Sequence, residues 1–200
     1  MSEPRLILDG LRVIDLSTGL AGAAATLMLA ESGADVVKVE PPDGDAMRGS
    51  AAFATFNRSK RSVVLDLSEA DARARLDDLL ADADVVVHSF HRAAAVPFGL
   101  DTATLSDRHP WLISCAITGW PADHADAALP CEETLVLARS GIVDEQRGNR
   151  VGPVYLRFPL ARWGAAYLAA IGVLARLVHR QRSGRGGAAD TSLLQARCWR

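Results

Sequence analysis

The chain has 200 residues, of which 49% are hydrophobic and 23% charged, and its formal net charge is −2. This length suffices for one domain with a sizeable core, and the composition is ordinary for a globular protein. A charge so near zero provides no overall attraction to nucleic acid or to an anionic membrane surface, so we expect neither as a partner.

Targeting and redox features point to a cytoplasmic protein. The opening residues, MSEPRLILDG, contain acids and a proline where a signal peptide has its apolar core. The longest apolar stretch, 163–178, is interrupted by Arg176 and falls short of the roughly 18 residues that a membrane span needs. Cys115, Cys131 and Cys198 are odd in number and widely spaced, which favours reduced thiols over a disulfide framework.

Strands and helices alternate through the first part of the chain. Apolar or β-branched runs predict strands at 11–16, 34–40, 63–67, 85–90 and 111–120. Helical spacing and capping residues predict helices within 17–33, 68–84 and 102–109. The connection 41–62 is long and polar, which by length alone suggests a functional loop. The order predicts an α/β fold over residues 1–125, a Rossmann-like, mostly parallel sheet with flanking helices.

The remaining residues, 126–200, read as a helical segment that completes the domain or crosses from it. Helices are predicted at 132–141 and, longer, at 160–182, and no strand is predicted after Trp120. The final string, DTSLLQARCWR, begins as an apolar helical turn and then stops. Because an amphipathic helix needs a partner and a cap, we expect a truncated or incomplete domain.

Open parallel sheets bind ligands beyond the carboxyl ends of their strands. This rule places 17–23, 40–48, 57–61 and 88–92 along one rim. The string GLAG after the first strand has the spacing G-x-x-G, whereas a dinucleotide fingerprint has G-x-G-x-x-G. The chain also lacks a Tyr-x-x-x-Lys pair for hydride chemistry, so a nicotinamide cofactor is disfavoured.

The rim is better described as a cationic cluster suited to phosphate oxygens. Its members are Lys38, Arg48, Arg58, Lys60, Arg61 and Arg92. The alternative is that these are ordinary charged surface loops. His88 and His91 have no further metal ligands near them in sequence, so we expect no metal and no resident cofactor.

Several strings, in the same order, resemble the family III CoA-transferases, the relatives of formyl-CoA transferase, carnitine CoA-transferase and α-methylacyl-CoA racemase. These strings are LRVIDLSTGLAGAAATLMLAESGADVVKVEPPDGDAMRG, NRSKRSVVLDL, ADVVVHSF, ISCAITGW and AAIGVLARLVHRQRSGRGGAADTSLL. The resemblance implies a Rossmann-like large domain that binds CoA, a smaller second domain that has no counterpart here, and two chains interlocked as a dimer. It also implies CoA or acyl-CoA as substrate, with a homodimer or a hetero-assembly with a longer relative.

By motif match, the resemblance places a set of residues at the CoA site. With the cationic cluster, the expected CoA-binding residues are Lys38, Arg48, Asn57, Arg58, Lys60, Arg61, His88, Ser89, Phe90 and Arg92.

The resemblance also implies a catalytic aspartate near the start of the long helix, in a pattern like P-V-A-D-x-x-x-G. Here the string is PLARWGAA, and Arg162 holds that position. An arginine can be neither an acyl-accepting nucleophile nor a general base. Arg162 is then a solvent-exposed arginine or a ligand for a phosphate or carboxylate. The carboxylates before the helix are Glu132, Glu133, Asp144 and Glu145, and of these Glu132 or Glu133 is the alternative nucleophile.

These residues leave several functions open. The first is CoA transfer between an acyl-CoA and a carboxylate. The second is a catalytically silent CoA-binding module or assembly partner of a complete relative, and the third is a truncated pseudo-enzyme. A racemase-like activity is a further variant, with His124 as a speculative member of its acid–base pair.

Overall fold

The computed structural model describes residues 6–145 and 151–197. Its sheet has seven strands in the order β3-β2-β1-β4-β5-β6, with β7 also paired to β5. Every pairing is parallel. The first five strands are β1 Arg12–Leu16, β2 Asp35–Glu40, β3 Arg61–Val64, β4 Val85–His88 and β5 Ile113–Thr118. The predicted α/β fold with a mostly parallel sheet and flanking helices is confirmed.

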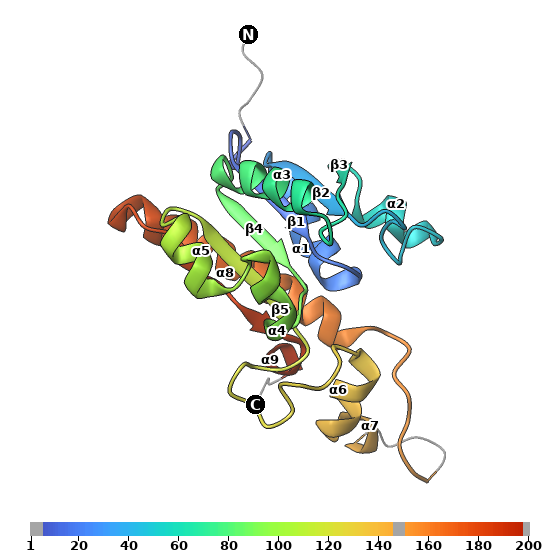
Figure 1. Ribbon diagram of the computed structural model, residues 1–200. Helices are drawn as coiled ribbons and strands as arrows, with labels where there is room; N and C mark the ends of the chain where they lie inside the picture. The colour runs from blue at the N-terminus through green and yellow to red at the C-terminus, as the bar shows by residue number, and fades with distance from the viewer. Residues whose placement is uncertain (1–5, 146–150, 198–200) are drawn as a thin grey trace.

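Helices cover both faces of this sheet (Figure 1). One face packs against α1 (Leu20–Glu31) and the long α8 (Leu160–Ser183). The other packs against α3 (Ala70–Ala81), α4 (Arg92–Ala95) and α5 (Thr102–Arg108). The remaining helical segments are α2 Ala51–Phe56, η1 Val96–Phe98, α6 Glu133–Arg139, α7 Ile142–Glu145 and α9 Leu193–Arg197.

Side-chain size explains how the helices approach the sheet. In α3, Leu76 and Leu80 are four residues apart and 1% exposed, so they share the face that packs on the sheet. Burying each contributes about 1.5–3 kcal/mol. In α8, Ala165 and Ala169 are fully buried, and these small side chains let its backbone lie close to α1.

The strands at the end of the chain correct the sequence-based prediction. Residues after Trp120 contribute β6 (Gly187–Ala188) and β7 (Thr191–Ser192), both paired to β5. Each strand is two residues long and contains little apolar sequence, so no periodic pattern revealed it. Gly186 allows this pairing, because a Cβ there would lie 2.1 Å from the carbonyl oxygen of Leu112.

Two further boundaries differ from the prediction. The connection 41–62 contains α2, a helix of six residues with no buried residue, which is too short to show a helical period in the sequence. Strand β3 begins at Arg61 and ends at Val64, earlier than the predicted 63–67. As the edge strand it is mostly exposed, so its polar first residues do not read as a strand. The division of the chain at residue 125 stays a prediction, and Cys198 lies outside the described residues.

Helix α8 has a second apolar face that no described residue covers. This face, here called the apolar face of α8, consists of Tyr167, Leu168, Ile171, Leu174 and Val178, all at least 37% exposed. By length and composition alone α8 is apolar enough to cross a membrane, a test that core helices of soluble proteins also pass. Its opposite face is packed against α1, as in such a core helix.

Candidate functional site

The turn between β1 and α1 lies at the carboxyl edge of the sheet, where ligands of open α/β sheets bind. This turn, Ser17–Thr18–Gly19, follows the last residue of β1, and Gly19 adopts φ 77° immediately before α1. The amide of Thr18 donates a hydrogen bond of 2.8 Å to Ser89 Oγ, just beyond β4. The structure therefore joins the ends of two neighbouring strands, and it brings the predicted Ser89 to this edge.

Lys38 and Lys60, predicted as part of the cationic cluster, are instead buried in the protein. Lys38 Nζ lies 2.9 Å from Asp45 Oδ2, and the Lys38 side chain is 2% exposed. Lys60 Nζ lies 3.1 Å from Asp15 Oδ2, and its side chain is 1% exposed. Both charges are balanced internally, so these ammonium groups contact carboxylates of the chain and not the solvent.

Three of the predicted arginines also have carboxylate partners. Arg48 donates two hydrogen bonds of 2.6 Å to the Glu40 carboxylate. Arg58 pairs with Glu31, and Arg61 pairs with Asp35. Arg61 is the first residue of β3, so it lies at the amino end of its strand and not beyond a carboxyl end.

Arg92 is the predicted cation that remains exposed without an ion pair among the described residues. It begins α4, three positions after Ser89. Its neighbour His91 caps that helix by accepting a hydrogen bond of 3.3 Å from the amide of Ala93. Arg92 is therefore an exposed cation that follows the β4 end closely in the chain.

A small cavity of about 90 Å³ lies beside the paired residues. It is lined by Lys38, Glu40, Arg48, Phe53, Asn57, Lys60, Arg61 and Ser62, so it brings together several predicted site residues from β2, β3 and the loops on either side of α2. The Arg48 guanidinium lies 4.5 Å from the centre of the Phe53 ring, a cation–π contact. The volume of this cavity is far below that of a cofactor pocket, so the cavity suits at most a small part of a ligand.

The predicted His88 and Phe90 form an aromatic cluster at the end of β4. Their ring centres are 5.9 Å apart, and Phe90 packs against Phe98 at 5.3 Å. Burial lowers the pKa of His88 below its usual range, although the negative charge of Asp190 opposes this. His88 is therefore a neutral, buried ring at neutral pH, which leaves it apolar packing and hydrogen bonding but no charge.

The first turn of α8 holds the position where a catalytic aspartate is expected, and it contains Arg162. Glu133 Oε1 accepts a hydrogen bond of 2.7 Å from the amide of Ala161, so this carboxylate satisfies a donor at the helix N-terminus. The Arg162 guanidinium lies 3.6 Å from Glu133 Oε2 and 3.5 Å from Glu132 Oε2. A carboxylate is thus present at this helix start, but it comes from α6 and is itself paired with the arginine.

Glu133 has an unusual environment for an acid. It is 7% exposed, and burial raises its pKa above the usual range despite the backbone donors and the nearby Arg162. The sequence offered only the adjacent acids Glu132 and Glu133, so their contact with a helix start 28 positions later required the fold. His124, the speculative racemase residue, stacks on Trp120 with ring centres 5.4 Å apart.

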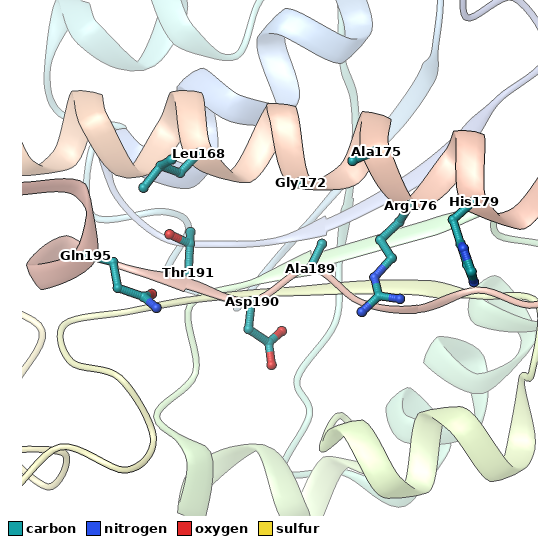
Figure 2. A pocket seen from close by; sticks show the side chains of 9 residues that line it. All are labelled: Leu168, Gly172, Ala175, Arg176, His179, Ala189, Asp190, Thr191 and Gln195. Carbon is teal, nitrogen blue, oxygen red and sulfur yellow. The ribbon is translucent and has the colours of Figure 1, made fainter. Parts of the chain in front are cut away.

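A larger groove of about 530 Å³ runs between α8 and the segment that carries β6 and β7. Figure 2 shows Arg176 and His179 projecting from α8 toward this segment, with Asp190 and Gln195 along the opposite side. Sequence reasoning did not identify this groove, because β6 and β7 were not predicted. Among residues 6–145 and 151–197, no group of three or more metal-binding side chains gathers.

Comparisons with known proteins agree with the fold and the order of motifs. Succinyl-CoA:mesaconate CoA-transferase from Haloarcula hispanica is 35% identical over 93% of this chain and 51% of its own length. The beta subunit of succinyl-CoA–L-malate CoA-transferase from Chloroflexus aurantiacus is 32% identical over 96% of this chain and 50% of its own. A crystal structure of a CAIB/BAIF family protein from Brucella suis superposes with a TM-score of 0.90 at 30% identity, covering 96% of this chain and 55% of that one.

The chain thus spans about half the length of these curated relatives. The family described as CoA-transferase family III matches residues 8–199, which is nearly the whole chain. The resemblance predicted from the sequence motifs is confirmed, and the chain belongs to CoA-transferase family III.

Proposed function

We propose that the chain binds the CoA part of an acyl-CoA at the carboxyl edge of its sheet and takes part in CoA transfer between an acyl-CoA and a carboxylate. One observation carries this proposal: a hydrogen bond from the amide of Thr18 to Ser89 connects the carboxyl ends of β1 and β4. Arg92, which has no ion pair among the described residues, follows Ser89 closely in the chain. A guanidinium suits phosphate oxygens, because it donates several charge-assisted hydrogen bonds from one planar group.

Among the predicted CoA-binding residues, exposed side chains can contact a ligand, whereas buried ones can only support the site. Arg92 and Ser89 lie at the accessible edge, and Arg48 keeps a half-exposed side chain that is paired with Glu40. Arg58 and Arg61 are exposed but paired with carboxylates. We therefore assign direct phosphate contact first to Arg92, and we assign Lys38 and Lys60 to the support of the site.

Arg162 determines whether the chain can form a covalent acyl intermediate. A covalent acyl intermediate requires a carboxylate nucleophile, and the side chain at the start of α8 is a guanidinium. We propose that the chain binds acyl-CoA without forming an acyl-enzyme. Transfer then needs a carboxylate from another chain, which makes this protein a CoA-binding module or assembly partner.

A second candidate is transfer through Glu133, which is favoured by its position at the N-terminus of α8. In that reaction a Glu133 oxygen attacks the thioester carbonyl, the carbon–sulfur bond breaks, and CoA leaves as a thiolate. The thiolate then attacks the resulting anhydride to give a glutamyl-CoA thioester and releases the acyl group as a carboxylate. Glu133 Oε2 is buried, so this route requires the first turn of α8 to open.

An assembly is supported by the apolar face of α8. Contiguous exposed apolar surface of this kind marks an interaction site, because monomers rarely leave such a patch uncovered. We propose that this face is covered in a homodimer or in a complex with a longer relative. One relative, the beta subunit from Chloroflexus aurantiacus, is by its name part of a multi-subunit enzyme.

Calorimetric titration with CoA and with dephospho-CoA tests the binding proposal. Arg92→Gln should weaken CoA binding by about tenfold, since it removes a charge-assisted contact. Arg139→Gln is the matched control, because Arg139 is an exposed arginine already paired with Asp126. Equal affinities of wild type and the Arg92 variant for CoA would reject the assignment of Arg92.

A further inference from the structure

Asp15 is a fully buried carboxylate beneath the β1–α1 turn. Its Oδ1 accepts a hydrogen bond of 2.9 Å from the amide of Ser17, the first residue of that turn. Its Oδ2 accepts from Thr26 Oγ1, in the middle of α1, at 2.6 Å. The Asp15 carboxylate therefore connects the turn to the helix that follows it.

Lys60 supplies the positive charge that makes this carboxylate stable. Its Nζ lies within 3.1 Å of Asp15 Oδ2, Ala23 O, Thr26 Oγ1 and Asn57 Oδ1. An ammonium has only three protons, so these acceptors already exceed its capacity. No proton is left for a ligand oxygen, and a side chain that is 1% exposed cannot reach one.

The same turn is held from two further directions. Lys38 Nζ donates to the carbonyl of Ser17 at 2.9 Å, and its charge is balanced by Asp45. Gly22 lets Ser17 pack against α1, because a Cβ at Gly22 would lie 2.0 Å from Ser17 Oγ. With Thr18 bound to Ser89, the turn is fixed against α1, β2 and β4.

We propose that Asp15 and Lys60 are a positioning pair that fixes the Ser17–Thr18–Gly19 turn for a CoA-type ligand, and that Lys60 does not contact the ligand. The identity of the ligand in this inference rests on the proposed function. The fixing of the turn by Asp15 and Lys60 rests on the contacts alone. It differs from the sequence-based prediction, in which Lys60 approaches the nucleotide of CoA. It also differs from a merely stabilising role, because it assigns a local effect to one turn.

A double-mutant comparison separates these roles. Lys60→Met leaves the Asp15 carboxylate buried without its ion-pair partner, whereas Asp15→Asn together with Lys60→Met removes both charges of the pair. Hydrogen exchange of the Ser17–Gly22 amides is measured without ligand, and CoA affinity by calorimetry. Arg139→Met is the control, because Arg139 is an exposed arginine whose ion pair with Asp126 lies outside the predicted CoA-binding set.

The proposal predicts that Lys60→Met speeds exchange in the turn and weakens CoA binding, each by about tenfold or more. The double variant should recover most of both losses, and Arg139→Met should change neither. Rescue by the double variant is specific to positioning, since removing Asp15 cannot restore a lost contact between Lys60 and a phosphate.

Several results would overturn the proposal. Unchanged exchange in Lys60→Met, or exchange that the double variant does not recover, rejects the pair. A double variant that binds CoA as weakly as the single one makes Lys60 a direct ligand. If wild type binds no CoA, the proposed function fails, but the exchange measurements still decide the pair. If Lys60→Met does not fold, Thr26→Val removes one hydroxyl from the network and should speed exchange in the same turn by about threefold.

Discussion

Arg162 and Glu133 form an ion pair at the first turn of α8, with 3.6 Å between the guanidinium Nε and the carboxylate Oε2. The glutamate satisfies the helix N-terminus through the amide of Ala161. A cation alone would be unfavourable there, because the helix dipole is already positive at that end. The carboxylate makes the arginine acceptable, and the arginine balances a carboxylate that is buried.

Arg162→Asp should not create a working nucleophile. The new carboxylate would stand beside Glu132 and Glu133 without their cation, and like charges raise the pKa of neighbouring acids. We expect no covalent adduct by intact mass after incubation with succinyl-CoA, and no transfer to a free carboxylate. Arg157→Asp, at an exposed arginine shortly before the helix, is the control. Substantial turnover by Arg162→Asp would contradict this account.

Glu133→Gln should stabilise the protein more as pH rises. Because burial raises the pKa of Glu133, its carboxyl group holds a proton better in the folded than in the unfolded state. Between the unfolded pKa, about 4.3, and the raised folded pKa, wild type therefore loses stability with increasing pH.

The glutamine variant has no charge to bury, and its side-chain oxygen can still accept from the amide of Ala161. Chemical denaturation over a pH series measures the difference in the free energy of unfolding between the two proteins. The difference should be smallest below the unfolded pKa and grow through the window in favour of Glu133→Gln. A difference that grows in favour of wild type would show that Arg162 outweighs burial.

Gly186→Ala should destabilise the edge of the sheet at β6. The added Cβ would lie 2.1 Å from the carbonyl oxygen of Leu112, which is backbone and cannot rotate away. Overpacking of this kind costs about 1–3 kcal/mol of unfolding free energy. Gly49→Ala is the control, because a Cβ at Gly49 meets nothing within 4 Å. Equal denaturation midpoints for the two variants would mean that β6 does not pair with β5 in solution.

Ile171→Glu should disrupt the proposed assembly. Ile171 is 61% exposed at the centre of the apolar face of α8, so a charge there is tolerated in the monomer and costly in an interface. Light scattering coupled to gel filtration should show an assembly for wild type and a smaller species for Ile171→Glu. Val64→Glu, at another exposed apolar residue, should leave the mass unchanged. A monomeric wild type would reject the α8 interface.

The sequence predicted the strands that carry long apolar runs, because β4 and β5 are buried on both faces of the sheet. It did not predict β6 and β7, whose pairing depends on backbone contact with β5. The cationic cluster was identified by residue type, yet the carboxylates that neutralise it come from distant positions such as Glu31 and Asp35. Charge at a rim can be read from a sequence, but whether that charge is free depends on partners that only the fold brings near.

One pair of measurements on the same purified sample tests the central claim most directly. Calorimetric titration with CoA is followed by intact mass spectrometry after an acyl-CoA is added. The account predicts saturable binding of CoA and an unchanged protein mass, since Arg162 replaces the nucleophile at α8. A covalent adduct would show that a carboxylate such as Glu133 performs the chemistry, and the absence of CoA binding would reject the site itself.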